Sequence, residues 1–289
     1  MRRNLIAGIA FALVLAACSP ATVPTTTSPA SPATTTTTTV PVTTTKGPAG
    51  TCPGEGAFKE GGRVARVPQP NSDATTLGRI SWDTSKGCEI FTFTFETAQG
   101  APATTPPSVR AAHLETFQIL RIYLDIEATT ITDQLVETPL VDRLFVVRSL
   151  DGGMFVDLHL ASPAQARVKL AKSPASLTLF LQPGENPFDG AATAGDLVVV
   201  ASPPSGAEVD QQVTVIGYSR TFEANVLFIA TAGDEIVAET FTTAADWVET
   251  WGEFRTSLQL PPGEISLFVG EESPRDGTLE GVTISLTVR

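Results

Sequence analysis

The feature that most constrains this fold is the alternation of apolar and polar residues with a period of two. The clearest run is Ile90-Phe91-Thr92-Phe93-Thr94-Phe95. Side chains alternate between the two faces of a strand, so such runs predict strands with one face in a core. Asp151-Gly152-Gly153 predicts a hairpin turn between two of them. Further strands are expected around Trp82 and at 117–124, 144–148, 154–160 and 177–181.

Two other segments of this half have a different pattern. Residues 98–108 are rich in Pro and Ala and predict a long surface loop. Residues 161–172 could form the only helix, but Pro163 argues against it because proline removes a helical hydrogen-bond donor.

Seven short strands are expected in the last third of the chain, separated by turn residues such as Pro261-Pro262-Gly263. Their number and spacing suggest an immunoglobulin-like sandwich. The predicted fold class is therefore all-β, with two β-sandwich-like domains at 51–184 and 197–289 and a linker at 185–196. The seven strands are expected at 197–201, 213–218, 224–230, 235–241, 254–260, 264–269 and 282–288.

The first residues predict export. Arg2 and Arg3 precede an apolar run that ends in Leu15-Ala16-Ala17-Cys18, which is the pattern of a signal peptide at 1–17. The last four residues resemble a lipobox, whose cysteine receives diacylglyceryl and palmitate chains and becomes the new N-terminus. An ordinary signal peptide with an incidental cysteine is the alternative. We favour lipidation of Cys18, which predicts an extracytoplasmic lipoprotein anchored to the cell membrane.

A Thr/Pro/Ala-rich segment follows the anchor at residues 18–50. It has no aromatic residue and a single charge, Lys46. Such a composition cannot bury enough apolar surface to fold, so it predicts a disordered linker that acts as a stalk.

The cysteine count fits this organisation. The chain has three cysteines, and an odd number in an exported protein calls for an explanation. Lipidation of Cys18 would leave Cys52 and Cys88 to form a disulfide, worth about 4 kcal/mol on a chain-entropy estimate. The alternative, two free or metal-binding thiols, lacks the clustered spacing of metal sites.

The charge restricts the partners. Loss of Arg2 and Arg3 with the signal peptide takes the formal net charge from −12 to −14. Because a strongly acidic surface repels phosphate, no nucleic-acid partner is expected. The same repulsion argues against docking on anionic lipid head groups or teichoic acids.

Several motifs of the C-terminal domain resemble the immunoglobulin-like domain of bacterial spore germination (the Gmad family). They include Val199-Val200-Ala201-Ser202-Pro203-Pro204, Trp251-Gly252-Glu253-Phe254 and Glu271-Glu272-Ser273-Pro274-Arg275-Asp276-Gly277. The resemblance covers nearly all of residues 197–289. It implies an extracytoplasmic β-sandwich without known catalysis.

The N-terminal domain resembles the AMIN-like domain of secreted bacterial lipoproteins. The matching stretches include Arg79-Ile80-Ser81-Trp82-Asp83, Gly87-Cys88-Glu89 and Phe155-Val156-Asp157-Leu158-His159-Leu160. Phe180 and Ile90 depart from the charged residues expected at their positions. The resemblance implies targeting to peptidoglycan.

No catalytic constellation is evident. Asp157 and His159 share one face of a strand, and we favour a polar sheet edge over a metal or acid–base pair. The acidic cluster at 271–276 lacks the pattern of a calcium loop, so a solvated turn is expected, in which Glu271 could pair with Arg275. No metal site and no cofactor are predicted.

Four residues are candidate ligand contacts. Trp247 and Trp251 could form a sugar-stacking shelf, although core packing is the commoner role of tryptophan in a sandwich. Arg121 and Arg148 could contact a peptidoglycan carboxylate, although a solvated strand face is the simpler interpretation.

The sequence thus predicts a non-catalytic cell-surface lipoprotein, an envelope binding or scaffold module. Its expected partners are the membrane, through the N-terminal lipid, and peptidoglycan or another envelope protein. The alternative is an envelope glycan-acting enzyme or its accessory subunit, which would need two facing carboxylates in a cleft.

Overall fold

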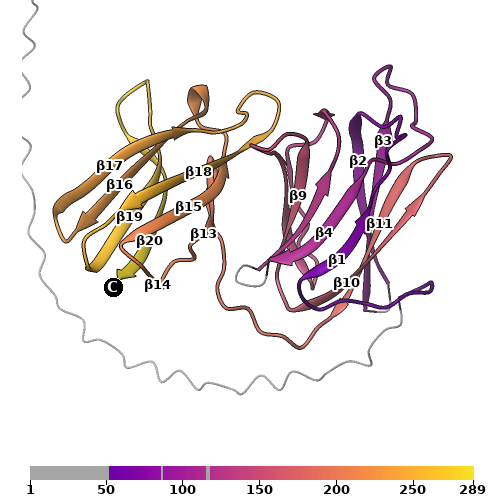
Figure 1. The fold of residues 1–289 in the computed structure, drawn as a ribbon, viewed down its shortest axis with the longest axis horizontal. Coiled ribbons are helices and arrows are strands. Elements are labelled where there is room, and N and C mark those ends of the chain that lie inside the picture. The colour runs from indigo at the N-terminus through magenta and orange to yellow at the C-terminus, as the bar shows by residue number, and fades with distance from the viewer. Residues whose placement is uncertain (1–51, 86, 115–117) are drawn as a thin grey trace, which may run out of the picture. The chain divides into compact units, whose positions relative to one another are not determined.

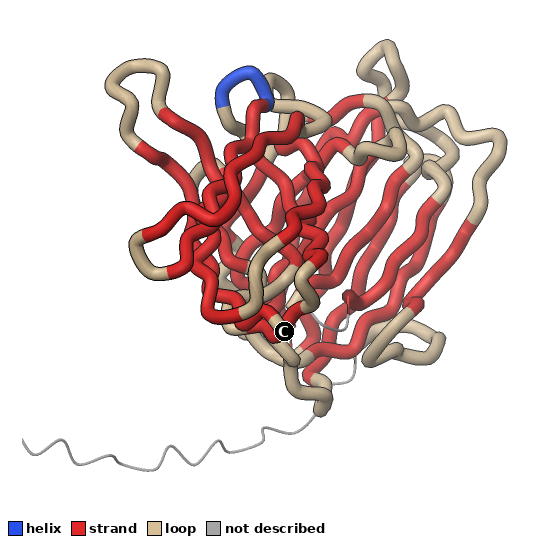
Figure 2. The backbone as a smooth tube through the Cα atoms, turned by 60° about the vertical axis from the view of Figure 1, so that its left-hand side comes forward, coloured by secondary structure: helices blue, strands red, loops and turns tan. Residues whose placement is uncertain are grey.

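The computed structural model describes residues 52–85, 87–114 and 118–289, and these residues form one compact unit (Figure 1). Cys18, the predicted signal peptide and the predicted Thr-rich linker lie outside the described residues. Figure 2 shows that the described chain consists of strands joined by loops, with one short 3-10 turn at Phe222–Ala224. The predicted all-β class is confirmed. In the part of the chain that the structure describes, no helix is long and apolar enough to cross a membrane.

The described chain has two large hydrophobic cores, and each belongs to one module. We call residues 52–184 the N-terminal module and residues 193–289 the C-terminal module. In the N-terminal module, two sheets enclose the first core. One sheet has the order β10-β11-β3-β2-β6, and the other contributes β1-β4-β5-β9-β8 with β7 beside β8. The strands are β1 Arg63–Val67, β2 Thr76–Ser85, β3 Cys88–Glu96, β4 Val109–Leu114, β5 Ile119–Leu124, β6 Ala128–Thr129, β7 Asp133–Leu135, β8 Val141–Arg148, β9 Met154–Leu160, β10 Ala164–Ala171 and β11 Ser176–Pro183.

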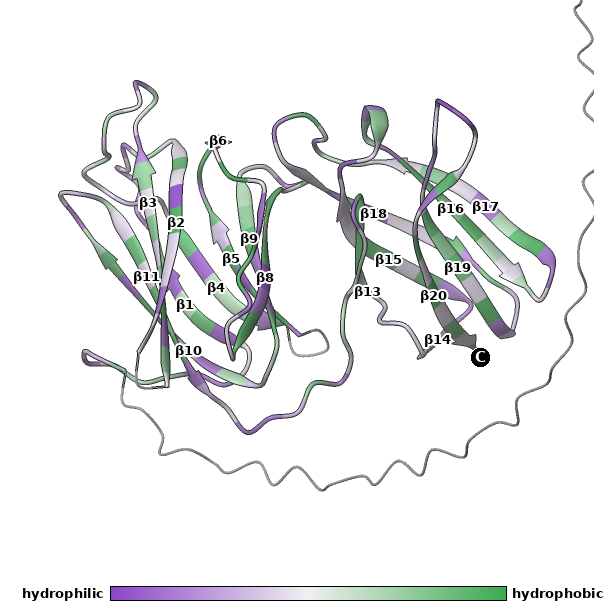
Figure 3. Cartoon of the chain, turned by 180° about the vertical axis from the view of Figure 1, so that it is seen from behind, coloured by the Kyte–Doolittle hydropathy of each residue, from purple (hydrophilic) through white to green (hydrophobic). Residues whose placement is uncertain are grey.

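The period-two pattern sets the first core. Phe91, Phe93 and Phe95 point inward from β3 and are buried, whereas Thr94 between them is exposed. Figure 3 shows apolar and polar residues alternating along many strands of both modules. Burial of a large apolar side chain contributes about 1.5–3 kcal/mol, so these phenylalanines anchor the sheet. The predicted hairpin is confirmed: β8 and β9 pair antiparallel, and Gly152 and Gly153 take positive φ angles in the turn.

Two segments of this module differ from a simple expectation. Residues 164–171 form strand β10, in agreement with the argument from Pro163 against a helix, and Ala164 and Ala166 point into the core from the edge of a sheet. The segment 98–108 is irregular as predicted, but it is not wholly on the surface, since Ala103 is fully buried. The Asp73 carboxylate fixes this loop by accepting hydrogen bonds from the backbone N–H groups of Thr104 and Thr105. These bonds lower the pKa of Asp73 to about 2.

The seven strands predicted in the C-terminal module are all present, with two short strands in addition. They form a sheet of order β14-β20-β19-β16-β17 and the run β18-β15-β13-β12 of a second sheet. Their inner faces enclose the second core, which includes Phe228, Phe254 and Leu267. The strands are β12 Thr193–Ala194, β13 Val198–Ser202, β14 Ala207–Val209, β15 Gln212–Ser219, β16 Asn225–Ala232, β17 Glu235–Thr243, β18 Trp251–Gln259, β19 Gly263–Glu272 and β20 Leu279–Val288.

The Cys52–Cys88 disulfide forms as predicted and ties the start of the described chain to β3. Phe180 packs against it, and the Arg167 guanidinium carbon lies 4.6 Å from the centroid of the Phe180 ring. Arg167 also donates a hydrogen bond to the Gly54 carbonyl. An apolar residue at position 180 is therefore accounted for by the disulfide that it covers.

Candidate functional site

A single sheet runs through both modules. β8 of the N-terminal module pairs in parallel with β18 of the C-terminal module, with Val147 opposite Trp251 and Arg148 opposite Gly252. This pairing joins the two halves into one ten-stranded sheet. The Thr250 hydroxyl adds a hydrogen bond of 2.6 Å to the Val146 carbonyl. We call the contact around β8 and β18 the junction.

Aromatic side chains fill the junction. Phe145 and Phe155 of the N-terminal module pack with Tyr218 and Trp251 of the C-terminal module in a third apolar cluster. The ring centroids of Phe145 and Trp251 are 5.0 Å apart, with an edge-on geometry. Trp251 is only 2% exposed, and its indole N–H donates to the Asp133 carboxylate at 3.2 Å. The outer faces of the two modules are therefore apolar where they meet.

A buried ion pair lies beside these rings. The Arg121 guanidinium donates two hydrogen bonds of 2.7 Å to the Asp157 carboxylate, which is fully buried. Arg121 stacks 3.8 Å above the Phe155 ring and lies 3.9 Å from the Glu253 carboxylate of the other module. Burial lowers the pKa of Arg121, but the charge of Asp157 outweighs it and raises that pKa above its usual range. Burial raises the pKa of Asp157, and the charge and hydrogen bonds of Arg121 oppose that rise, so the carboxylate depends on its partner.

Glu253 also connects the modules. Its carboxylate accepts hydrogen bonds from the Ser149 hydroxyl at 2.9 Å and from the Leu150 backbone N–H at 3.0 Å. Glu253 is 5% exposed, so these bonds compensate for the loss of water. The predicted strand motif around Trp251 thus supplies polar as well as apolar contacts to the junction.

His159 and Tyr218 form a second polar contact across the junction. The His159 Nε2 atom and the Tyr218 hydroxyl are 2.6 Å apart. Burial, followed by the positive charges of Arg143 and Arg121, lowers the pKa of His159 to about 3. Burial also raises the pKa of Tyr218 well above its usual value. A neutral imidazole that accepts a hydrogen bond from the protonated Tyr218 hydroxyl fits both shifts.

Acid should weaken the fold through His159. The unfolded chain protonates this residue near pH 6.5, whereas the folded chain resists protonation down to about pH 3. The unfolded state therefore binds more protons in this window, and stability falls as the pH drops below 6.5. Between pH 7 and pH 4.5, we expect the free energy of unfolding of the wild type to fall by about 1–2 kcal/mol more than that of His159→Gln. The effect is kept to this size because the His159 side chain is partly exposed to solvent. Urea unfolding at each pH measures this difference. If the free energy of unfolding changed equally with pH in the two proteins, the prediction would be refuted.

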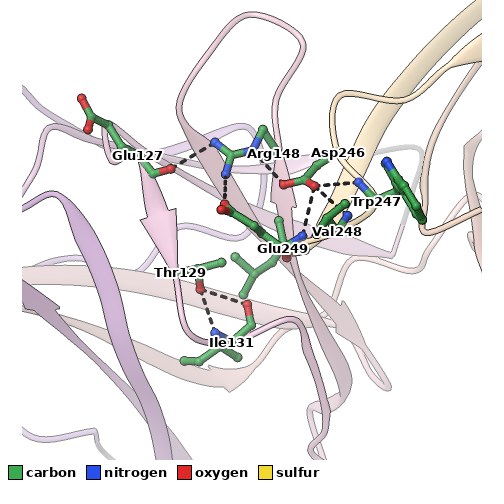
Figure 4. A network of polar contacts seen from close by, with 10 residues as sticks. Glu127, Thr129, Ile131, Arg148, Asp246, Trp247, Val248 and Glu249 are labelled. Atoms are coloured by element: carbon green, nitrogen blue, oxygen red, sulfur yellow. Dashed lines mark hydrogen bonds and ion pairs between the residues drawn. The ribbon is translucent and has the colours of Figure 1, made fainter. Parts of the chain in front are cut away.

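Arg148 holds the outer end of the junction (Figure 4). Its guanidinium pairs with Asp246 at 2.9 Å and Glu249 at 2.8 Å, and donates to the Glu127 carbonyl at 3.1 Å. Burial by itself would raise the pKa of Asp246, but the Arg148 bond and the backbone N–H groups of residues 247–249 lower it. One arginine of the N-terminal module therefore fixes the loop of the C-terminal module that precedes β18.

The structure changes the interpretation of the four predicted contact residues. Trp251 is buried, as the favoured interpretation of core packing predicts, so it does not form a sugar-stacking shelf with Trp247. Arg121 is buried as well, so the solvated strand face expected for it is wrong. Arg148 is engaged by two carboxylates. Trp247 is half-buried and packs edge-on against Phe222, with 5.4 Å between ring centroids. Asp157 was predicted to lie at a polar sheet edge, but its strand β9 lies inside the sheet between β5 and β8. The Asp157 side chain is fully buried, because the C-terminal module covers this face.

An open part of the same sheet face remains. Arg66 of β1 pairs with Arg110 of β4, Arg110 with Tyr123 of β5, and Tyr123 with Phe155 of β9. Directly paired residues share a face, so this row leads from exposed arginines to the buried junction. The Arg110 guanidinium carbon lies 3.8 Å from the centroid of the Tyr123 ring. We call Arg66, Arg110 and Tyr123 the arginine row.

A cavity of about 490 Å³ opens over the arginine row. Asp125, Asp151 and the Gly152–Gly153 turn also line it. Like charges directly opposite each other weaken a sheet, and no ion pair within the described chain neutralises Arg66 or Arg110. In a chain of net charge −12, two exposed guanidinium groups beside an aromatic ring have the chemistry to bind a carboxylate. The sequence interpretation missed it because β1 and β4 carry no clear alternation.

The acidic cluster at 271–276 forms a turn. Arg275 lies 3.9 Å from Asp276, not beside Glu271 as suggested, and Glu271 accepts a hydrogen bond from the Phe222 backbone N–H. Thr278 donates to Asp276 through its hydroxyl and its backbone N–H, and these bonds lower the pKa of Asp276. Within residues 52–85, 87–114 and 118–289, no group of three or more His, Cys, Asp or Glu side chains is placed to bind a metal ion.

Comparison with known proteins identifies one part of the chain. Residues 197–278 match the immunoglobulin-like domain of bacterial spore germination (Gmad2), so the resemblance indicated by the C-terminal motifs is confirmed. No curated protein matches the chain, and no solved structure matches it either. The AMIN-like nature of residues 51–184 stays a prediction.

Proposed function

We propose that this chain is a non-catalytic, lipid-anchored envelope protein that binds peptidoglycan stem peptides at the arginine row. The observation that carries the proposal is the open row of Arg66, Arg110 and Tyr123 on an otherwise acidic chain. Arginine recognises carboxylates with paired hydrogen bonds, and an aromatic ring gives a flat apolar platform. The match of residues 197–278 to an immunoglobulin-like domain supports the role of a surface module.

The other charges of the cavity refine the ligand class. Asp125 and Asp151 lie beside the two arginines, so the cavity presents both signs of charge. Stem peptides of peptidoglycan carry carboxylates together with a side-chain ammonium group, and such a zwitterionic ligand complements both. A purely anionic polymer would be repelled by the two aspartates and by the net negative charge of the chain.

The buried carboxylates favour binding over catalysis. Asp157 is held by Arg121, and Glu253 by Ser149 and Leu150. Glu89 accepts bonds from the Thr138 hydroxyl and the Leu140 N–H. Each therefore has a structural partner, whereas a glycosidase needs two facing acids that reach the substrate.

The anchor is the second part of the proposal. Lipid on Cys18, followed by the Thr/Pro/Ala-rich segment, would hold the two modules outside the membrane within reach of the cell wall. Growth with a radioactive fatty acid tests this part by itself. We expect label on the wild-type protein and none on Cys18→Ala, and label that persists in the variant would contradict attachment at this residue.

Cosedimentation tests the binding. The fragment 46–289 is expected to pellet with insoluble peptidoglycan, and Arg110→Met should weaken binding by about tenfold, since a hydrogen bond to a charged group contributes about 1.5–3 kcal/mol. Arg255→Met is the matched control, because Arg255 is exposed on β18 and its loss changes the net charge equally. Equal pelleting of both variants would exclude the arginine row, and no pelleting of wild type would exclude peptidoglycan as the ligand.

A further inference from the structure

The outer face of the sheet β14-β20-β19-β16-β17 is unusually apolar for a surface. Phe241 of β17 pairs with Leu227 of β16, Leu227 with Gly270 of β19, and Gly270 with Gly281 of β20. These residues form one row across four strands. Ile229 and Phe268 form the middle of the next row on the same face, and Leu279 lies two residues before Gly281. We call Leu227, Ile229, Phe241, Phe268 and Leu279 the outer apolar face.

Two glycines keep the middle of this face flat. A Cβ atom on Gly270 would lie 2.2 Å from the Glu280 carbonyl oxygen and 2.5 Å from the Phe268 ring. A Cβ atom on Gly281 would lie 2.2 Å from the Val269 carbonyl oxygen and 3.0 Å from the same ring. The Phe268 ring therefore lies over both glycines. A smooth apolar surface results, at a place where side chains would normally project.

The face is uncovered within the described chain. Phe241 is 70% exposed and Leu279 52% exposed, whereas the outer face of the other sheet is buried in the junction. Single exposed apolar residues are ordinary, but a contiguous set on one sheet face marks an interaction surface. The edge strand β17, which carries Phe241, pairs on one side only, with β16.

Charge identifies the partner. A hollow of about 550 Å³ at the end of this face is lined by Phe222, Leu227 and Phe241. It is also lined by five carboxylates, those of Glu223, Glu239, Glu271, Glu272 and Asp276, against one cation, Arg275. A second copy of this chain would bring the same carboxylates against them, and an anionic membrane surface would be repelled. A cationic segment is attracted.

We propose that the outer apolar face is a docking surface for an extended segment of another protein, with apolar side chains flanked by Lys or Arg. The apolar side chains lie on Leu227, Phe241 and Phe268, and the cationic ones reach Glu239, Glu271 and Glu272. This partner is separate from the ligand of the arginine row, which lies on the N-terminal module. The protein thus holds an envelope peptide with one module and a second protein with the other.

Photo-crosslinking of the full chain in the cells that make it tests the proposal. A benzophenone residue replaces Phe241, and the matched control replaces Leu135, which is 60% exposed on β7 of the N-terminal module and lies away from the outer apolar face. Both side chains are exposed, so neither change should unfold the protein. We expect adducts at position 241 about tenfold above those at 135, on a Lys- or Arg-bearing segment of another protein. We expect the double variant Glu239→Lys, Glu272→Lys to lower the yield at 241 by a similar factor, since both carboxylates are exposed and line the hollow.

Every other result overturns the proposal. Adducts to a second copy of this chain would make the face a dimer interface, and adducts to lipid would make it a membrane contact. Equal yields at 241 and 135, or a yield unchanged by the charge reversal, would show that no cationic partner docks there. Peptidoglycan binding by the arginine row is measured separately, so either proposal can fail without the other.

Discussion

Replacing Arg121 by methionine should lower the free energy of unfolding by about 3–5 kcal/mol. The substitution leaves Asp157 without its partner at a position that is fully buried, with the Glu253 carboxylate nearby. An uncompensated buried charge costs far more than the net contribution of the ion pair. Urea unfolding followed by tryptophan fluorescence measures the loss, and the fluorescence of Trp251 should report it directly because this ring lies in the same junction.

Two control variants separate this cause from others. Arg63→Met removes an exposed arginine from β1 and should change stability by less than about 0.5 kcal/mol. The double variant Arg121→Met, Asp157→Leu should recover most of the loss, because apolar pairs often replace buried ion pairs without cost. A double variant as unstable as Arg121→Met alone would mean that packing on Phe155, not charge, is what Arg121 supplies.

Replacing Trp251 by alanine is expected to cost about 3–5 kcal/mol and to separate the unfolding of the two modules. Trp251 packs against Phe145 and Tyr218 between the modules and is not a member of either large core. Each module keeps its own core when this ring is lost. Calorimetry should therefore show one transition for wild type and two for the variant.

Trp82 provides the comparison. It is half-buried at the N-terminal core and stacks on Phe91 with 6.1 Å between ring centroids. Trp82→Ala should lower the melting temperature while leaving a single transition. Two transitions already in wild type would contradict the rigid coupling that the junction implies.

The sequence predicts the strands better than it predicts their surroundings. The alternation in β3 fixes which side chains enter the first core, and all seven strands predicted in the C-terminal module are present. The sequence pattern does not indicate β1 or β10 as strands. β1 is short and β10 carries small residues, and both properties weaken the period-two signal.

The junction was beyond the sequence interpretation, because its contacts join residues far apart in the chain. Val146 and Thr250 are 104 positions apart, and Arg121 and Asp157 are 36 apart. One signal was present: β8 and β9 are nearly continuous apolar runs, which is typical of strands buried on both faces. Their burial explains why Trp251 and Arg121 are structural residues and why the exposed arginines had to be found from strand register.

The central claim is that the arginine row binds the carboxylates of a stem peptide. Calorimetric titration of the fragment 46–289 with a soluble stem tetrapeptide tests it most directly, with the double variant Arg66→Gln, Arg110→Gln as comparison. We predict that wild type binds, that the variant binds at least about tenfold more weakly, and that a tetrapeptide whose carboxylates are converted to amides loses affinity by a similar factor. Equal affinities of wild type and variant, or of the free and amidated peptides, would contradict the claim.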